Sequence, residues 1–366
     1  MQPDNSTRKY KRRRVLRLAA LAAGTSILPA ACRTVNSTSP APDAAVDGTV
    51  PTTTSTPIAQ STSGNVNVSK VVLVRTDNRV AGTQKALDLL QPEGISDRTV
   101  FLKPNYNTGD PAPAATDTQL LEALVQDLQK AGTKGITIGD RSGMANTRQA
   151  MEQKQVFQLA DRYGLETIVF DEMDADQWQY ISAEGTHWQK GFAFASPILD
   201  AGAIINTCCL KTHRFGGHFT LSLKNSVGMV AKYVPGDSFN YMQDLHSSPH
   251  QRVMIAEINQ AYKPALILLD GVEAFVNGGP ASGKKVKAGV MLAGTDRVAV
   301  DAVAIAILRS LGTTDAVSSG SIWELEQIKR AVELGLGASS AEQIELVTAD
   351  SASQTMADQI RKLLTI

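Results

Sequence analysis

Cysteine is scarce in this chain, which holds three cysteines in 366 residues. No Cys-x-x-Cys pair occurs, so the sequence excludes a ferredoxin-type cluster or a zinc site built from cysteines, and we expect no iron–sulfur cluster. Cys208 and Cys209 are adjacent, and neighbouring side chains of a strand point to opposite faces, so these two rarely bridge each other. We interpret them as small apolar side chains of a buried strand.

The N-terminal apolar stretch, residues 18–28, is Ala-rich, interrupted by Gly24, and too short for a membrane-spanning helix. It follows residues 12–17 (RRRVLR), which resemble the twin-arginine export signal. We therefore predict that residues 1–31 are an export signal peptide and that the twin-arginine export machinery is a partner. An Arg-rich leader for general secretion is the alternative.

Cys32 is the second part of this signal. Ala30-Ala31-Cys32 resembles the end of a lipobox, where the cysteine is lipidated and becomes the new N-terminus, although Pro29 replaces the usual aliphatic residue. Residues 33–69 are rich in Thr, Ser, Pro and Ala without aromatics, which predicts a disordered linker. We expect an exported protein anchored to a membrane surface through lipidated Cys32, on the outer side of the cytoplasmic membrane. Without lipidation it would be soluble outside the cytoplasm, for example periplasmic.

The formal net charge of zero conceals an uneven distribution. Residues 1–31 hold seven Lys/Arg and one acidic residue, so the remaining chain has 29 basic and 35 acidic residues, a net charge of −6. A mildly acidic body argues against nucleic acid as a general partner, but it does not exclude a local basic pocket.

Apolar strands alternate with amphipathic helices, which predicts an α/β fold with a mostly parallel sheet and helices on both faces. We assign this domain to residues 70–350 and a C-terminal helix to 351–366. The domain has either one lobe or two, because the acidic segment 171–190 breaks the alternation of strands and helices. The predicted strands are 70–75, 99–103, 135–139, 167–170, 203–210, 265–269 and 290–293. The predicted helices are 116–130, 147–163, 253–262 and 298–311, followed by a final helix-strand-helix from about 321.

Polar residues follow four of these strands. Lys103 and Asn105 follow the second, Asp140 the third, Lys211 the strand at 203–210, and Asp270 the strand at 265–269. Ligands of parallel α/β sheets bind at the carboxyl ends of strands, so these positions predict a site. Ordinary solvated loops are the alternative.

Residues 210–228 form the segment with the highest density of candidate catalytic and binding side chains. Neutral imidazoles can bind a metal or transfer protons, and cations beside glycine-exposed N–H groups suit an anion. A solvated loop is the alternative, and the spacing of five residues disfavours a zinc pair. The segment contains Lys211, His213, Arg214, His218, Lys224 and Asn225; the candidate metal ligands are His213, His218 and His250.

A glycine-rich stretch at residues 277–285 superficially resembles a phosphate loop. It fails the GxxxxGK[ST] pattern, because Lys285 stands where Ser or Thr would hold magnesium, and Pro280 removes one N–H donor. We predict a flexible loop on the substrate side, with Gly279 and Gly283 near the ligand.

An ordered series of motifs over residues 71–312 resembles the family known as domain of unknown function 362. The motifs are Lys103-Pro104-Asn105, Lys211-Thr212-His213, Lys224-Asn225 with Gly228, Asp270-Gly271, Gly279-Pro280 with Gly283, and Asp296 with Val298-Ala299 and Asp301-Ala302. No reaction is generally assigned to this family. Many relatives carry ferredoxin-like cysteine motifs that this chain lacks, so the resemblance does not extend to an iron–sulfur cluster.

The leading hypothesis is an exported, enzyme-like protein that binds an anionic small molecule, with a divalent metal as an open option. His213 would be a general acid/base or metal ligand, Lys211 and Lys224 would clamp the anion, and Asp270 would orient a histidine or hold the metal. Asp301 falls in the first turn of a predicted helix, where a carboxylate is favourable without any function. The competing hypothesis is a non-catalytic, membrane-tethered lipoprotein that binds a ligand or assists assembly.

Overall fold

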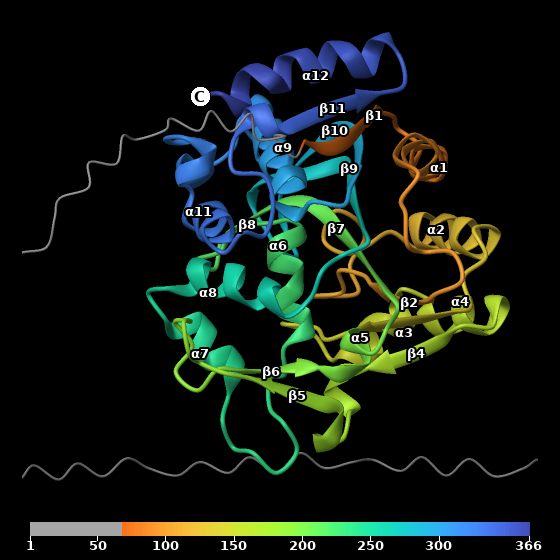
Figure 1. Ribbon diagram of the computed structural model, residues 1–366, viewed down its shortest axis with the longest axis vertical. Helices are drawn as coiled ribbons and strands as arrows, with labels where there is room; N and C mark the ends of the chain where they lie inside the picture. Colours follow the sequence, from red (N-terminus) through yellow and green to blue (C-terminus); the bar gives the residue numbers. More distant parts are fainter. Residues whose placement is uncertain (1–67) are drawn as a thin grey trace, which may run out of the picture. The chain divides into compact units, whose positions relative to one another are not determined.

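A nine-stranded sheet lies at the centre of the protein, with helices on both faces (Figure 1). The structure is a computed structural model that describes residues 68–366, so the predicted signal peptide, Cys32 and residues 33–67 lie outside the described part. The strand order is β11-β1-β10-β9-β7-β2-β3-β4, and β8 pairs with β7. The strands are β1 (Ser69–Arg75), β2 (Thr99–Lys103), β3 (Gly135–Asp140), β4 (Glu166–Val169), β7 (Ala203–His213), β8 (His218–Thr220), β9 (Leu266–Gly278), β10 (Gly283–Gly294) and β11 (Ile344–Thr348).

Most neighbouring strands of the sheet are parallel. The run β9-β7-β2-β3-β4 is parallel throughout, as is the pair β11-β1, whereas β10 is antiparallel to both β1 and β9. This arrangement confirms the predicted α/β class with a mostly parallel sheet covered on both faces.

Two apolar cores lie on opposite faces of the sheet. Val71 and Leu73 of β1 point into one core and Val72 and Val74 into the other, as alternate side chains of a strand do. Helices α9, α11 and α12 cover the first core and α1, α2 and α4 the second. The helices are α1 (Arg79–Leu90), α2 (Thr118–Lys130), α3 (Thr147–Gln153), α4 (Val156–Tyr163), α5 (Ser196–Leu199), α6 (Ser222–Asn225), α7 (Tyr241–Ser247), α8 (Gln251–Ile258), α9 (Arg297–Ser310), α10 (Asp315–Ser318), α11 (Glu326–Glu333) and α12 (Ser351–Leu364).

Several predicted elements differ from the structure, among them the strand predicted at 290–293, which is the end of the longer β10. The helix predicted at 147–163 is two helices, α3 and α4, because Gln155 between them has a left-handed backbone with φ of 56°. The strand predicted to end at residue 269 continues through Asp270 to Gly278, since it pairs along its length with β10. β7 likewise runs on through Lys211 to His213, where it pairs with β8. The polar residues of these two strands therefore lie within the sheet and not in loops.

The acidic segment at residues 171–190 contributes to a small two-stranded sheet of β5 (Trp178–Ile181) and β6 (Phe192–Ala195). It shares a third apolar core with α8, through Phe194, Trp188 and Ile255. Residues 68–366 fall within one compact unit. In this part of the chain, no helix is both long and apolar enough to cross a membrane.

Candidate functional site

The carboxyl ends of β7, β2 and β3 meet at one edge of the sheet, because these strands are parallel neighbours. A cavity of about 360 Å³ lies there, between the strand ends and α6. Seven residues predicted from sequence line it: Lys103, Asn105, Asp140, Lys211, His213, Lys224 and Asn225. The lining is completed by Tyr106, Asn107, Arg141, Gly143, Met144, Phe215, Thr220, Val227, Gly228, Met242, His246 and Pro280.

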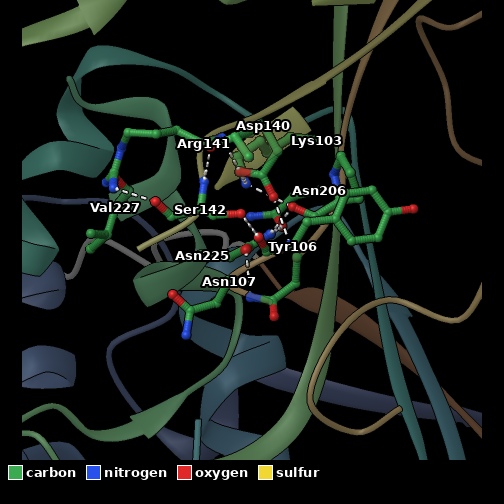
Figure 2. A network of polar contacts seen from close by, with 12 residues as sticks. Lys103, Tyr106, Asn107, Asp140, Arg141, Ser142, Asn206, Asn225 and Val227 are labelled. Atoms are coloured by element: carbon green, nitrogen blue, oxygen red, sulfur yellow. Dashed lines mark hydrogen bonds and ion pairs between the residues drawn. The ribbon is translucent and has the colours of Figure 1, made fainter. Parts of the chain in front are cut away.

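A buried ion pair joins the ends of β2 and β3 (Figure 2). Lys103 Nζ lies 2.6 Å from Asp140 Oδ1, and both residues are buried. Asp140 also accepts hydrogen bonds from the backbone N–H groups of Tyr106 and Arg141, each at 2.7 Å. Burial lowers the pKa of Lys103 and raises the pKa of Asp140, and the ion pair opposes both shifts. The pair fixes the relative position of two strand ends.

Gly228 packs directly against this ion pair. A Cβ atom at Gly228 would lie 2.6 Å from Asp140 Oδ1 and 2.9 Å from Lys103 Nζ. Only glycine leaves room for both groups, which gives a physical reason for glycine in the motif Lys224-Asn225 with Gly228.

A chain of side-chain amides connects β2, β7 and α6. Asn105 Nδ2 donates to Asn225 Oδ1 at 2.8 Å, and Asn225 Nδ2 donates to Asn206 Oδ1 at 2.6 Å. Asn105 Oδ1 in turn accepts from Lys211 Nζ at 2.9 Å. Each amide is thus held in one orientation, and Asn225 fixes α6 against the strand ends (Figure 2).

Lys211 and Arg141 are buried cations whose N–H groups are occupied by oxygens of the protein. Lys211 Nζ donates to Asn105 and to the backbone carbonyls of Ala114 and Pro280. The Arg141 guanidinium donates to the backbone carbonyls of Val227 and Val230 and of its neighbour Ser142. Burial lowers the pKa of both groups. Within residues 68–366 neither forms an ion pair with a carboxylate, so both add uncompensated positive charge near the cavity.

Lys224 differs from these two cations because its ammonium group has no partner in the described part of the chain. Its side chain is buried at 6 % exposure and lines the cavity, but its ammonium has no hydrogen-bond or ion-pair partner within residues 68–366. Burial, with the positive charges of Arg141 and Lys211, lowers the pKa of Lys224 from 10.5 to about 7. This amine therefore titrates near neutral pH.

His213 lies beside Lys224 and is also without a partner. Its Nδ1 atom is buried and makes no hydrogen bond in the described part of the chain. A Cβ atom at Gly217, in the turn between β7 and β8, would lie 3.2 Å from His213 Nδ1 and 2.5 Å from Lys224 Cε, so both side chains pack over this glycine. Burial, with the charges of Lys224 and Lys211, holds the pKa of His213 well below its usual value. The imidazole is therefore neutral at physiological pH.

Asp270 does not reach the cavity. Its carboxylate accepts from Arg79 Nε of α1 at 2.7 Å and from the backbone N–H of Val272 at 3.0 Å. The structure thus places Asp270 away from His213, and it does not show the expected contact with a histidine. Its observed role is to tie α1 to β9.

The three histidines predicted as metal ligands do not converge. His218 pairs with His213 across β7 and β8, and both residues line a second hollow of about 260 Å³, but His250 is not part of its lining. The ring of His250 lies 4.7 Å from that of His187, which is hydrogen-bonded to Glu257 at 2.7 Å. Residues 68–366 contain no group of three or more His, Cys, Asp or Glu placed to hold a metal ion.

Gly279 lies in the tight connection between β9 and β10, Gly283 is the first residue of β10, and neither lines the cavity. Gly279 has a φ of 67°, and a Cβ there would lie 2.0 Å from the carbonyl oxygen of Thr212. This close approach to β7 brings the neighbouring Pro280 into the lining, where its carbonyl accepts from Lys211 at 3.2 Å. The glycines therefore act on the cavity through packing.

Several lining residues were given no role from the sequence. Arg141 belongs to the polar set Asp140-Arg141-Ser142-Gly143 after the third predicted strand, and this position is the signal that marks it. Phe215 and Met144 are 47 % and 55 % exposed and give the cavity an apolar rim, but nothing local distinguishes them from ordinary loop residues. From the sequence, His246 and His250 were expected either over the mouth of the site or at the start of the next helix; His246 lies on α7 and is part of the lining, whereas His250 is not.

Comparisons with known proteins agree with the motifs. The family described as Domain of unknown function (DUF362) matches residues 100–306. A thylakoid-associated protein, sll1697, of Synechocystis sp. is 27% identical over 259 residues, covering 66% of this chain and 75% of its own length. The lactate racemase apoprotein from Thermoanaerobacterium thermosaccharolyticum gives a TM-score of 0.39 at 13% identity; the match covers 64% of this chain and 56% of that structure.

Proposed function

This chain belongs to the DUF362 family, and on that premise we propose that its cavity binds an anionic small molecule. The observation that carries the proposal is the charge of the lining. Among the described residues, four cationic side chains (Lys103, Arg141, Lys211 and Lys224) line the cavity against a single carboxylate, Asp140. Because Asp140 is already paired with Lys103, no carboxylate of the lining balances Arg141 and Lys211, and Lys224 adds to their positive charge when it is protonated, which favours an anion.

An enzyme-like role fits this site better than passive binding. Lys224 titrates near neutral pH, and His213 beside it is neutral and has an unpartnered nitrogen. Groups with shifted pKa values that face a cavity are typical of catalytic sites. A non-catalytic lipoprotein that binds a ligand or assists assembly is the alternative, and it would need the positive lining but no reactive group.

We further propose that the protein is exported and tethered to a membrane through lipidated Cys32. The support is the leader sequence at residues 1–32 together with the relative named as thylakoid-associated. Both observations concern location only, and they are independent of the anion site.

A divalent metal stays a separate proposal with His213 as its first ligand. The described residues offer His213 no nearby pair of further protein ligands, so a metal there would depend on oxygens of the substrate. Elemental analysis of the purified protein, with a His213→Ala control, tests it directly. Equal metal content in the two proteins would remove this proposal.

Calorimetric titration of the full chain with sulfate and with small carboxylates tests anion binding. At neutral pH we expect Lys224→Met to weaken binding by about tenfold to a hundredfold, since hydrogen bonds to charged groups contribute roughly 1.5–3 kcal/mol. Lys130→Met is the matched control, because Lys130 is 68% exposed on α2 and outside the lining. Equal affinities for the two variants, or no anion bound by the natural protein, would overturn the proposal.

A further inference from the structure

We propose that Lys224 is a nucleophile that forms an imine with the carbonyl carbon of its substrate, an aldehyde or ketone that carries a carboxylate or phosphate. This inference rests on the proposed anion site and names the substrate class for it. It starts from a difference in hydrogen bonding among the cationic side chains of the cavity. Lys103, Arg141 and Lys211 each contact two or three oxygens of the protein, whereas the Lys224 amine has no partner within residues 68–366.

The engaged cations attract the anionic group of the substrate. Their charge also disfavours the protonated form of Lys224, because Arg141 and Lys211 both act to lower its pKa, which is about 7. A lysine in such a setting is largely a free amine at about pH 7.5, whereas an exposed lysine with a pKa near 10.4 is about a thousandth neutral. Desolvation beside other cations is the usual way in which a protein activates a lysine for imine formation.

His213 is placed to move the protons of this step. Its ring nitrogen and the Lys224 Cε atom pack against the same face of Gly217, and this nitrogen is buried without a hydrogen-bond partner within residues 68–366, so it is available to accept a proton and return it. The neutral amine adds to the carbonyl carbon and forms a C–N bond, while the C=O π electrons move to oxygen. His213 transfers one proton from nitrogen to that oxygen, which gives a neutral carbinolamine. It then transfers the second nitrogen proton to the hydroxyl as the C–O bond breaks, so both hydrogens of the released water come from the amine. One C=N bond forms and one water leaves, and no oxidant or reductant is required.

The apolar rim of the cavity favours a substrate that has an apolar part as well as an anionic group. Phe215 and Met144 at the rim and Met242 inside the cavity offer apolar contact beside the charged wall. A cavity of about 360 Å³ accommodates a small organic anion with a short apolar or aromatic part. Inorganic anions would fill only the charged end.

The test uses pyridoxal 5′-phosphate, an aldehyde with a phosphate group, on the full chain, followed by borohydride reduction and peptide mass spectrometry. At about pH 7.5 we expect Lys224 to be labelled at least about tenfold faster than exposed Lys130, since its neutral fraction is far larger. Sulfate should slow labelling of Lys224 and leave Lys130 unaffected. His213→Gln should slow imine formation at Lys224 by about a hundredfold, as expected for loss of an acid/base group.

Lys224→Arg is the second variant, because it keeps the positive charge but cannot form the imine. It should lose the label at this position, keep labelling at Lys130, and still bind sulfate. Labelled Lys130 with unlabelled Lys224 in the natural protein would overturn the inference, and if sulfate still binds, the anion-binding proposal survives alone. If Lys224 is labelled rapidly and sulfate does not slow this labelling, the result would instead contradict the anion site. An unchanged rate in His213→Gln would remove His213 from the step.

Discussion

At the scale of single residues, Lys224 costs folding free energy as long as the cavity holds no anion. Its pKa falls from 10.5 in the unfolded chain to about 7 in the fold. Between these two values the unfolded chain holds a proton that the native protein lacks, so the contribution of Lys224 makes the fold more stable as pH rises through this window. An anion beside the ammonium reverses the preference, because it favours the charged form.

Anion binding should therefore be coupled to proton uptake at Lys224. At about pH 8 the free site is mainly neutral, so we expect sulfate binding to take up close to one proton, and at about pH 5, where Lys224 is already charged, close to none. Titration calorimetry in buffers of different ionisation enthalpy measures this number. Lys224→Met is the control, since the neighbouring histidines remain in it. A binding enthalpy that does not change with the buffer at about pH 8 would contradict the assignment.

Two lysines of the cavity also show what could not be predicted from the sequence. Lys211 and Lys224 were both predicted as anion clamps from one segment, and both line the cavity. The structure separates them, because Lys211 is saturated by Asn105, Ala114 and Pro280. These partners lie 69 to 106 residues away along the chain, so no local pattern could reveal which lysine would stay without one.

At the scale of elements, the strands were predictable in position but not in length. Apolar runs identified β7 and β9, yet both continue through polar residues. Asp270-Gly271 looks like the start of a turn, but pairing of β9 with β10 keeps this dipeptide in the sheet. Arg79, from α1, then becomes the partner of Asp270 across 191 residues. Tertiary pairing decided both outcomes, and it leaves no trace in the local sequence.

Asp301 shows the same effect on a helix. In the sequence it is explained by the dipole of its own helix, α9. In the structure its carboxylate accepts from Ser222 Oγ at 2.6 Å and from the backbone N–H groups of Ser222 at 2.8 Å and Leu223 at 3.0 Å. It thereby fixes the start of α6, the short helix that carries Lys224 and Asn225.

Replacing Asp301 should therefore affect both stability and the cavity. Asp301→Asn presents an amide N–H₂ to groups that are themselves donors, so we expect the free energy of unfolding to fall by about 1–3 kcal/mol and sulfate binding to weaken. Asp358→Asn on the exposed side of α12 is the matched control and should stay within about 0.5 kcal/mol of the natural protein. Guanidinium unfolding and calorimetry provide the two readouts. Equal stability of the two variants would show that Asp301 does not position α6.

At the scale of the whole molecule, the net charge of the chain after residue 31 and the charge of the cavity lining have opposite signs. The chain after residue 31 carries a net charge of −6, yet the cavity at the strand ends is lined by four basic side chains and one carboxylate. The alternation of strands and helices was enough to predict the α/β class, and strand-end positions together with the segment at residues 210–228 selected seven residues of the lining. The fold alone brings these cations together, since β2, β3, β7 and α6 each supply a different part of the lining. An acidic surface around a basic pocket favours small anions over nucleic acid, whose extended phosphate backbone needs an extended basic face.

The location of the molecule depends on a different part of the chain, so it can be tested without disturbing the cavity. In a bacterial host with both export pathways, we expect the natural protein in the membrane fraction with a lipid mass on its N-terminal peptide, and Cys32→Ser in the soluble fraction outside the cytoplasm. Ser37→Ala, a nearby change outside the signal, should behave like the natural protein. Joint replacement of Arg12 and Arg13 by lysine should retain the protein in the cytoplasm. Cys32→Ser found on the membrane would rule out this tether, and it would shift attention to surfaces of residues 68–366 as the means of attachment, because no helix there can span the bilayer.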